Sequence, residues 1–256
     1  MIRLVLLSLL ACASIGVAAE IPPQDRRSGF EFMSPQTQAM QSEETSNPGM
    51  LWVADGERLF GEPQGSADKS CASCHAEAPK SMRGVAARYP TFDEETKRPI
   101  DLMGRINQCR VKRQGAASLA YQSDELLALA AYVAYQSHGM PIAPPADSRL
   151  QPFRENGRAW YEQRLGQLQL SCAACHDDRW GARLGGSVIP QGHPTGYPLY
   201  RLEWQNMGSL QRRLRGCLVG VRAQPFDFGA PEYVDIELFL MERAKGLKME
   251  TPAVRP

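Results

Sequence analysis

Two stretches of periodic apolar residues lie in the middle and near the end of the chain, and both predict amphipathic helices. The first follows the helix start signal Ser123-Asp124-Glu125, and the second follows Glu232. Their apolar positions are Leu126, Leu127, Leu129, Ala130 and Val133, and Val234, Ile236, Leu238, Phe239 and Leu240. Each stretch ends at a glycine, Gly139 or Gly246. Because no region alternates apolar and polar residues over the length of a strand, the pattern predicts an all-α fold.

The first nineteen residues combine a basic end with an apolar run. Arg3 precedes apolar residues 4–17, and Val17-Ala18-Ala19 offers small residues before a cut at Glu20. This predicts a signal peptide over residues 1–19, export to the periplasm, and a mature chain with no membrane span. An alternative makes Cys12 a lipoprotein acceptor, although Leu10 fits that motif poorly.

Prolines interrupt the helical pattern in two places. Residues 20–47 are polar and proline-rich, which predicts an extended N-terminal arm draped over the first domain. The alternative is a disordered tail, but the apolar residues Phe30, Phe32 and Met33 favour docking. Residues 144–150 contain two prolines and predict a linker that cannot stay helical.

The motif Cys-x-x-Cys-His occurs twice and carries the candidate chemistry. The two copies are Cys71-Ala72-Ser73-Cys74-His75 and Cys172-Ala173-Ala174-Cys175-His176. In this motif the two thiols add to the vinyl groups of a haem, and the histidine becomes an axial ligand of the iron. The sequence therefore predicts two covalently bound c-type haems.

The surroundings of the two motifs also repeat. A glycine, Gly56 or Gly157, precedes each motif by fifteen residues, and a lone cysteine, Cys109 or Cys217, follows it. Between each motif and its lone cysteine, we expect Tyr89-Pro90-Thr91 to correspond to His193-Pro194-Thr195. These matches indicate an internal repeat of one haem domain. The alternative, one zinc ion held by both cysteine pairs, would have to join them across about a hundred residues, far beyond zinc-ribbon spacings.

The repeat and the proline-rich segments together predict the domain organisation. We expect two tandem cytochrome c-like domains, over residues 48–143 with the first haem and residues 151–256 with the second, separated by the linker. The 256 residues are enough for both, and a hydrophobic share of 43% is enough for real cores. The net charge of +1 gives no general attraction to nucleic acid or to anionic membranes.

The second axial ligand of each iron is less certain from the pattern. Met103 and Met207 lie before the lone cysteines and remain candidates. Cys109 and Cys217 occupy what we expect to be equivalent loops before the two final helices. They could form a disulfide with each other, or they could be buried, inert thiols.

Basic residues surround both lone cysteines and favour thiolate ligands. Those near the first are Arg110, Lys112 and Arg113, and those near the second are Arg212, Arg213, Arg215 and Arg222. Nearby guanidinium groups stabilise a thiolate and also bind tetrahedral oxyanions. The cluster around Cys217 therefore predicts an anion site, and a sulfur oxyanion suits a thiolate beside a one-electron acceptor.

The chain resembles the SoxA family of the bacterial thiosulfate-oxidising system, in its diheme form. The resemblance lies in residues 29–35, residues 47–53, both haem motifs, residues 221–223 with Glu232-Tyr233, and residues 246–255. It implies an L-cysteine S-thiosulfotransferase that conjugates thiosulfate to a cysteine of the SoxYZ carrier protein. Electrons would pass to the monohaem partner SoxX and then to a soluble c-type cytochrome.

The resemblance also implies roles for individual residues. Cys217 is expected to be the catalytic cysteine persulfide and an axial ligand of the second haem with His176, and Arg213 to bind the substrate, helped by Arg212 or Arg222. His75 and Cys109 are expected to ligate the first haem. Cys71 and Cys74, and Cys172 and Cys175, would attach the two haems.

Two other classes of function stay open at this point. One is a diheme electron carrier without chemistry of its own, which would use methionine or histidine as the distal ligand. The other is a diheme peroxidase, which needs one iron with an open position. For His138 and His193 we expect surface or supporting roles rather than iron ligation.

Overall fold

A computed structural model describes residues 21–256 of the chain. The predicted signal peptide and the alternative lipid acceptor Cys12 lie outside the described residues. No helix within the described part is long and apolar enough to cross a membrane.

Helices make up most of the regular structure and confirm the helix-rich prediction. The α-helices are α1 (Pro35–Ser42), α2 (Met50–Gly61), α3 (Cys71–His75), α4 (Ala78–Ser81), α5 (Leu102–Cys109), α6 (Asp124–Tyr135), α7 (Gln151–Glu162), α8 (Cys172–His176), α9 (Leu210–Gly220) and α10 (Pro231–Arg243). The 3-10 turns are η1 (Pro23–Asp25), η2 (Gly29–Phe32), η3 (Ala86–Arg88) and η5 (Ser148–Leu150), and η4 (Arg110–Gln114) is a π-helical turn.

Short strands, which the sequence pattern did not predict, form three small sheets. They are β1 (Thr91–Asp93), β2 (Arg98–Ile100), β3 (Arg183–Leu184), β4 (Ser187–Val188), β5 (Leu199–Arg201), β6 (Asn206–Gly208) and β7 (Ala253–Arg255). Strands β1 and β2 pair antiparallel, as do β3 and β4, while β5 lies between antiparallel β6 and parallel β7. Strands this short show no alternation that a sequence pattern could detect.

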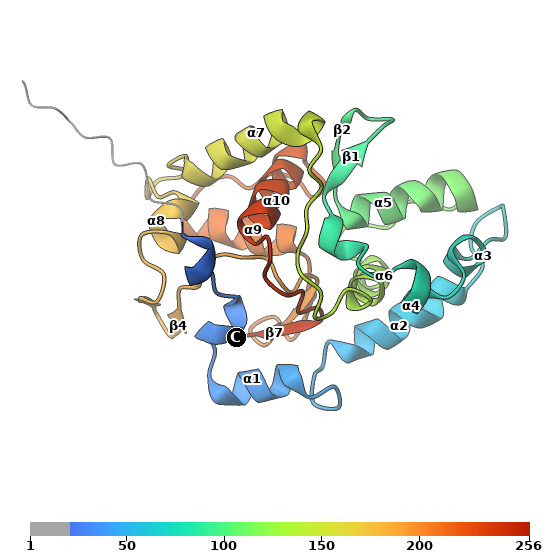
Figure 1. The fold of residues 1–256 in the computed structure, drawn as a ribbon, viewed down its shortest axis with the longest axis horizontal. Coiled ribbons are helices and arrows are strands. Elements are labelled where there is room, and N and C mark those ends of the chain that lie inside the picture. Colours follow the sequence, from blue (N-terminus) through green and yellow to red (C-terminus); the bar gives the residue numbers. More distant parts are fainter. Residues whose placement is uncertain (1–20) are drawn as a thin grey trace, which may run out of the picture.

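Two pairs of helices pack against each other most extensively, α2 against α6 and α7 against α10 (Figure 1). The predicted start of α6 is confirmed, since the Ser123 side chain accepts a hydrogen bond from the Leu126 backbone N–H. Each pair crosses at a glycine. A Cβ on Gly56 would lie 2.1 Å from the Ala128 carbonyl oxygen, and one on Gly157 would lie 2.0 Å from that of Asp235. Only glycine allows these backbones to approach so closely.

The hairpin before each lone cysteine repeats residue for residue at an offset of 108 positions. Thr91 pairs with Ile100 in the first hairpin, and Leu199 pairs with Gly208 in the second. Asp101 and Ser209 then start the two cysteine helices as N-caps. Tyr89-Pro90 therefore corresponds to Tyr197-Pro198, and the expected match with His193-Pro194 was wrong. That match relied on the shared Pro-Thr pair, whereas Tyr197-Pro198 lies at the same distance before its cysteine as Tyr89-Pro90.

The N-terminal arm docks onto the molecule, as its apolar residues indicated, but mainly against the second repeat. Helix α1 packs along β7, and the Asn47 side chain donates to the Pro252 carbonyl oxygen at 2.8 Å. The arm also contacts the first repeat through Glu44, which accepts a hydrogen bond from Tyr135. The expectation that it covers the first domain was wrong, because most of its hydrogen-bonding partners lie in the second repeat, on the loop after α8 and on the C-terminal segment.

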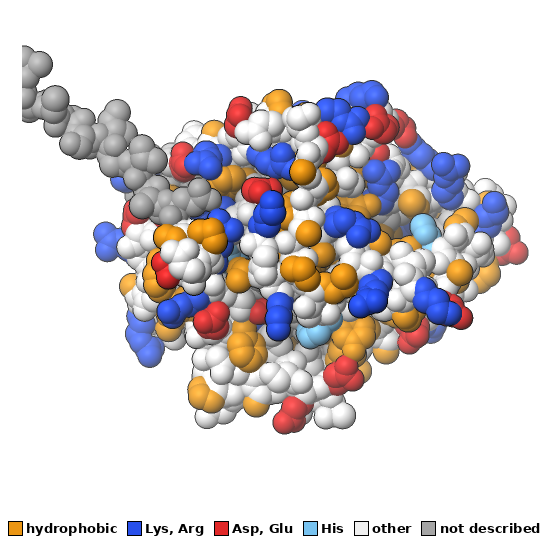
Figure 2. Space-filling view, viewed as in Figure 1, with side chains coloured by type: hydrophobic (Ala, Val, Ile, Leu, Met, Phe, Trp, Pro, Cys, Tyr) orange, Lys and Arg blue, Asp and Glu red, His pale blue; other side chains and the backbone are white. Residues whose placement is uncertain are grey.

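Basic and acidic side chains are interspersed over the face shown in Figure 2. This mixed surface agrees with the balanced composition of 29 basic and 28 acidic residues. Any strong electrostatic site must therefore be local.

Candidate functional site

Both Cys-x-x-Cys-His motifs form a single helical turn. Ser70 caps α3 by accepting from the Ser73 backbone N–H at 3.0 Å, and Ser171 caps α8 by accepting from Ala174 N–H at 3.1 Å. In one turn of helix, the first and fourth residues share a face, so the two sulfur atoms of each motif point to the same side. This geometry suits attachment of one haem through two thioether bonds.

Cys217 and His176 lie together in the second repeat, where they hydrogen-bond through their side chains. Burial alone would raise the pKa of the Cys217 thiol. The hydrogen bond with His176 and the positive charges of Arg213 and Arg201 outweigh burial and lower the pKa to about 7. Cys172 also lies close to Cys217 and has a pKa raised to about 12, mainly by burial.

His176 is held from its other side by the loop that follows α8. Its Nδ1 donates to the Pro190 carbonyl oxygen at 2.6 Å. Gly192 has a φ of +76°, and a Cβ there would lie 3.1 Å from Cγ of the imidazole. Gln191 fixes this loop to the arm, since it accepts from Arg27 N–H at 2.7 Å and donates to the Asp25 carbonyl oxygen at 3.0 Å. The arm therefore supports the position of His176.

Two arginines, Arg213 and Arg201, lie close to Cys217. Arg213 is one helical turn before the cysteine on α9, and Arg201 ends β5. Burial and the charge of Arg213 lower the pKa of Arg201, which shows that the two guanidinium groups are near each other. Tyr197 lies beside both Arg213 and Cys217, and burial raises its pKa. Two converging guanidinium groups beside a sulfur atom form a site for an oxyanion.

The rest of the predicted basic cluster points elsewhere. Arg212 lies over the Trp204 ring at 4.2 Å, and Arg215 lies over the Phe228 ring at 4.6 Å. Arg222 lines a pocket on the other side of Leu218. Arg201 faces the same Trp204 ring at 5.4 Å. The expectation that Arg212 or Arg222 assists Arg213 stays a prediction.

The first repeat brings Cys109 close to Cys71 and Cys74. Its pKa is raised by burial, which the opposing charges of Arg105 and Arg113 do not overcome. The charge of Arg113, which follows Cys109, does favour the thiolate, but burial outweighs it. Lys112 pairs with Glu95 instead, and Arg110 donates to the Ala117 carbonyl oxygen.

The two lone cysteines were expected in loops, but they lie on helices. Cys109 ends α5 and Cys217 lies within α9, two helices that begin at the N-caps Asp101 and Ser209 and that the apolar pattern did not predict. Within the described residues both are free thiols, so the proposed disulfide between them is not formed. Each lies near the haem motif of its own repeat.

Other candidate ligands have structural roles. Met103 and Met207 are buried in the core formed by α2 and α6. His138 Nδ1 donates to the Thr251 carbonyl oxygen at 3.0 Å, and His193 Nδ1 donates to that of Arg27 at 2.8 Å. Both histidines therefore support the backbone, in agreement with the expectation.

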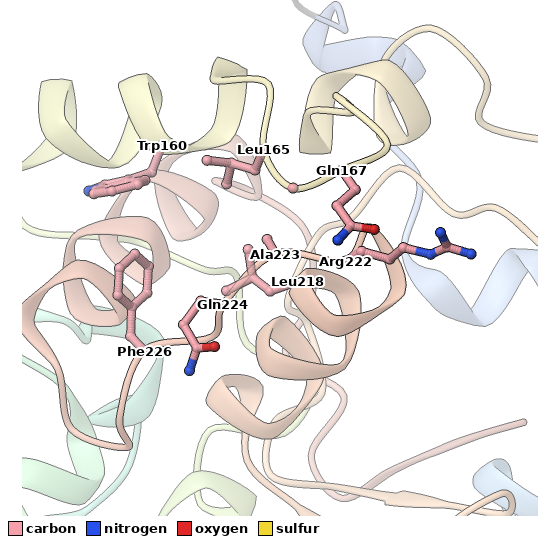
Figure 3. A pocket seen from close by; sticks show the side chains of 9 residues that line it. Trp160, Leu165, Gln167, Leu218, Arg222, Ala223, Gln224 and Phe226 are labelled. Atoms are coloured by element: carbon pink, nitrogen blue, oxygen red, sulfur yellow. The ribbon is translucent and has the colours of Figure 1, made fainter.

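An open pocket of about 490 Å³ lies beside the motif of the second repeat. Figure 3 shows Trp160 and Phe226 at one end and Gln167 and Arg222 near the other. Its apolar residues Trp160, Leu165, Leu218 and Phe226 belong to the same cluster as Cys172. An apolar pocket beside the thiols of Cys172 and Cys175 fits a covalently bound haem, for which His176 and Cys217 are candidate axial ligands.

The helical fold, the paired haem motifs and the apolar pocket define a c-type cytochrome. Residues 55–142 match the family described as SoxA/TsdA, cytochrome c domain. The chain is 38% identical over 235 residues to the L-cysteine S-thiosulfotransferase subunit SoxA of Pseudaminobacter salicylatoxidans, covering 91% of this chain and 82% of that protein. It is 36% identical over 229 residues to the subunit of the same name in Rhodovulum sulfidophilum, covering 90% and 80%.

A solved structure is similar as well. The chain matches one described as the crystal structure of SoxXA from P. pantotrophus with a TM-score of 0.86 and 32% identity, covering 90% of this chain and 87% of that chain. The chain belongs to the SoxA family of L-cysteine S-thiosulfotransferase subunits. The resemblance inferred from the sequence is thereby confirmed.

Sequence reasoning missed Arg201 and the loop that supports His176. Arg201 is sixteen residues before Cys217, and only the hairpin of β5 and β6 brings it back to the cysteine. The offset of 108 positions could have revealed the correct hairpin alignment. For Gln191, no local pattern shows which backbone groups its side chain binds.

Proposed function

We propose that this chain is the catalytic subunit that oxidatively conjugates thiosulfate to a carrier-protein cysteine. The observation that carries the proposal is that Cys217 lies near His176, Arg213 and Arg201. A sulfur nucleophile, a haem-binding histidine and a pair of guanidinium groups are the parts this reaction needs. The names of the related subunits support the same activity.

The proposed ligand sets follow the repeat. Cys172 and Cys175 would attach the second haem, with His176 and Cys217 as its axial ligands. Cys71 and Cys74 would attach the first haem, with His75 and Cys109 as its axial ligands. When bound, the haem supplies one-electron oxidation.

The arginines would bind the sulfonate end of thiosulfate through paired hydrogen bonds. Its outer sulfur then faces Cys217, which we propose acts as a persulfide. Overall, a carrier thiol and S₂O₃²⁻ give a carrier cysteine S-thiosulfonate, one proton and two electrons. Two oxidised c-type cytochromes would accept these electrons one at a time.

The partners and the compartment are part of the proposal. SoxX is the proposed partner subunit, supported by the similar structure described as SoxXA. The SoxYZ carrier would supply the acceptor cysteine, and a soluble c-type cytochrome would take the electrons. Thioether attachment of haem outside the cytoplasm and the predicted signal peptide support a periplasmic location.

The test compares Cys217→Met with Cys109→Met in the complex with the partner subunit. We expect both variants to retain haem, because methionine can ligate iron. Conjugation of thiosulfate to the carrier, followed as a mass increase, should be abolished in Cys217→Met and retained in Cys109→Met. Full activity of Cys217→Met would refute the proposal and favour a plain electron carrier.

The modification of the cysteine is tested by the intact mass of the mature protein. A reductant-labile sulfur that maps to Cys217 would support the persulfide. Loss of the extra mass on reduction, with both haems retained, distinguishes it from a covalent haem adduct.

A further inference from the structure

The two repeats present the same backbone to two cysteines, but opposite charges lie beside them. At the offset of 108 positions, Arg105 corresponds to Arg213, and each is four residues before its cysteine. The first strand of the hairpin, β1 or β5, ends at Asp93 in the first repeat and at Arg201 in the second. The structure therefore contains two versions of one hairpin and helix that share the arginine and the cysteine and differ at many other positions, including this strand end.

In the first repeat, Asp93 neutralises the arginine. Arg105 Nη1 lies 3.0 Å from Asp93 Oδ1, and the Asp93 side chain is 3% exposed. Thr96 donates to the same carboxylate from its backbone N–H and its hydroxyl, both at 2.9 Å, and Gln108 Nε2 donates at 3.2 Å. These hydrogen bonds lower the pKa of Asp93 against the effect of burial. The carboxylate is fixed and charged, so Arg105 cannot offer a free positive charge to an anion.

In the second repeat, the corresponding strand position adds a positive charge. Arg201 lies near both Arg213 and Cys217. Its own partner, Glu203 at 2.9 Å, has a side chain that is 65% exposed. The Arg201 side chain is 14% exposed, but Glu203 lies largely in solvent, so an oxyanion can replace its carboxylate at a small cost in free energy.

A second difference concerns space. Gln108, which binds both Asp93 and Arg105 in the first repeat, corresponds to Gly216 in the second. A Cβ on Gly216 would have no atom within 4 Å. The residue that fills the first site is therefore absent from the second, where the space is open.

We propose that Arg201 and Gly216, against their counterparts Asp93 and Gln108, determine which cysteine can receive a sulfur oxyanion. Arg201 and Gly216 complete an anion site beside Cys217, and Asp93 and Gln108 close the same site beside Cys109. This inference rests on the proposed function, since it explains why the chemistry takes place at one of two similar cysteines. It also makes Arg201 a specificity-determining residue.

Selenate provides a probe that is independent of turnover, because it is a tetrahedral dianion without a transferable sulfur. Crystals of the haem-loaded complex are soaked over a range of selenate concentrations, and anomalous difference maps give the occupancy beside each cysteine. In the wild-type protein we expect selenate at Arg201 and Arg213 and none at Arg105. Arg201→Asp should weaken binding beside Cys217 at least about tenfold, because one positive charge is replaced by a negative one.

The transplanted site gives the reverse test. Asp93→Arg combined with Gln108→Gly should create a selenate site beside Cys109 while binding beside Cys217 stays unchanged. Asp93→Asn is the conservative second variant, because its amide oxygen can still accept from Thr96 and preserve the turn. In the wild type, equal selenate occupancy beside both cysteines, or an adventitious ion only at other surfaces, would overturn the proposal. So would the absence of any new selenate binding at Arg105 in both variants of Asp93.

Thiosulfate conjugation is measured separately on the same proteins. Selenate binding at Arg201 without any conjugation would refute the proposed function and leave the anion site intact. Conjugation that persists in Arg201→Asp with unchanged selenate affinity would refute the role of Arg201 and leave the proposed function intact.

Discussion

The Nδ1 atom of His176 and the carbonyl oxygen of Pro190 lie 2.6 Å apart, within a short hydrogen bond. Such a bond fixes the orientation of an axial imidazole and makes it a more basic ligand. The loop that carries this carbonyl is held by Gln191, which binds the backbone of Asp25 and Arg27 in the N-terminal arm. The arm is therefore linked to the loop of the proposed haem ligand through the buried Gln191, and also through His193, which donates to the Arg27 carbonyl oxygen.

Replacing this glutamine should alter the second haem while sparing the first. In Gln191→Ala the loop loses the two Gln191 contacts with the arm and keeps that of His193 with the Arg27 carbonyl oxygen. The loop is then held less firmly, so the hydrogen bond to His176 weakens and the imidazole becomes a poorer donor to the iron. We expect a higher reduction potential of the second haem, measured by redox titration. The first haem serves as an internal reference.

The matched control is Gln41→Ala. Gln41 also fixes the arm, but it does so by accepting from Val254 N–H and Arg255 at the C-terminal strand. Loosening the arm there should leave both potentials unchanged. If the two variants shifted the second potential equally, the effect would come from the arm in general and the specific role of Gln191 would be disproved.

The chemistry of the haem motifs could be predicted from the sequence because covalent attachment needs adjacent residues. Cys172, Cys175 and His176 lie within one turn, so their spacing alone carries the information. The final helices were also predictable, since their apolar faces repeat with the helical period. Both kinds of signal are local in sequence.

The remaining part of the site depends on contacts between distant segments. Arg201 reaches Cys217 through a hairpin of three-residue strands, and Gln191 meets Arg27 across more than a hundred residues. Basic residues next to a cysteine in sequence proved a poor guide. Arg212 and Arg215 turn away onto aromatic rings, because a step of one or two residues rotates a helical side chain to another face.

Neutralising either arginine of the proposed anion site should weaken thiosulfate binding more than it slows the reaction of bound thiosulfate. Arg201→Gln removes a charge that we propose contacts thiosulfate but leaves Arg213 and Cys217 in place. We expect KM for thiosulfate to rise about tenfold, with a smaller change in kcat. Arg215→Gln, on the same helix as Arg213 but over the Phe228 ring at 4.6 Å, is the control and should keep KM within about twofold. Steady-state kinetics with the carrier protein measure both values, and equal effects of the two variants would refute the assignment.

Adding a methyl group at the crossing of α7 and α10 should strongly destabilise the second repeat. In Gly157→Ala the new Cβ would meet the Asp235 carbonyl oxygen at 2.0 Å, so the helices must move apart. We expect a loss of about 2–4 kcal/mol in the free energy of unfolding. Gly61→Ala, at the end of α2 with no atom within 4 Å of the new Cβ, should change stability by less than about 1 kcal/mol. Denaturant unfolding compares them, and a small effect at Gly157 would show that the crossing is not tightly packed.

The buried carboxyl group of Asp235 should make stability decrease as the pH rises. Its Oδ2 lies 3.5 Å from Arg98 Nη2 and accepts from Asn156 at 3.4 Å, while its buried Oδ1 has no hydrogen-bond partner among the described residues. Burial raises its pKa to about 6, with Glu232 adding to the shift and Arg98 opposing it. The folded protein therefore holds this proton more tightly than the unfolded chain, whose value is near 3.8.

The sign of the pH dependence follows from this difference. Below pH 3.8 the group is protonated in both states and its stabilising contribution is complete; this contribution is lost as the pH rises towards 6. Asp235→Asn cannot ionise, so it should gain about 1–2 kcal/mol over the wild type between pH 4.5 and 7.5. Urea unfolding at both pH values measures the gain, with the exposed Asp55→Asn as the control. A gain that does not grow with pH would mean that Asp235 is ionised throughout, stabilised by Arg98 more than burial penalises it.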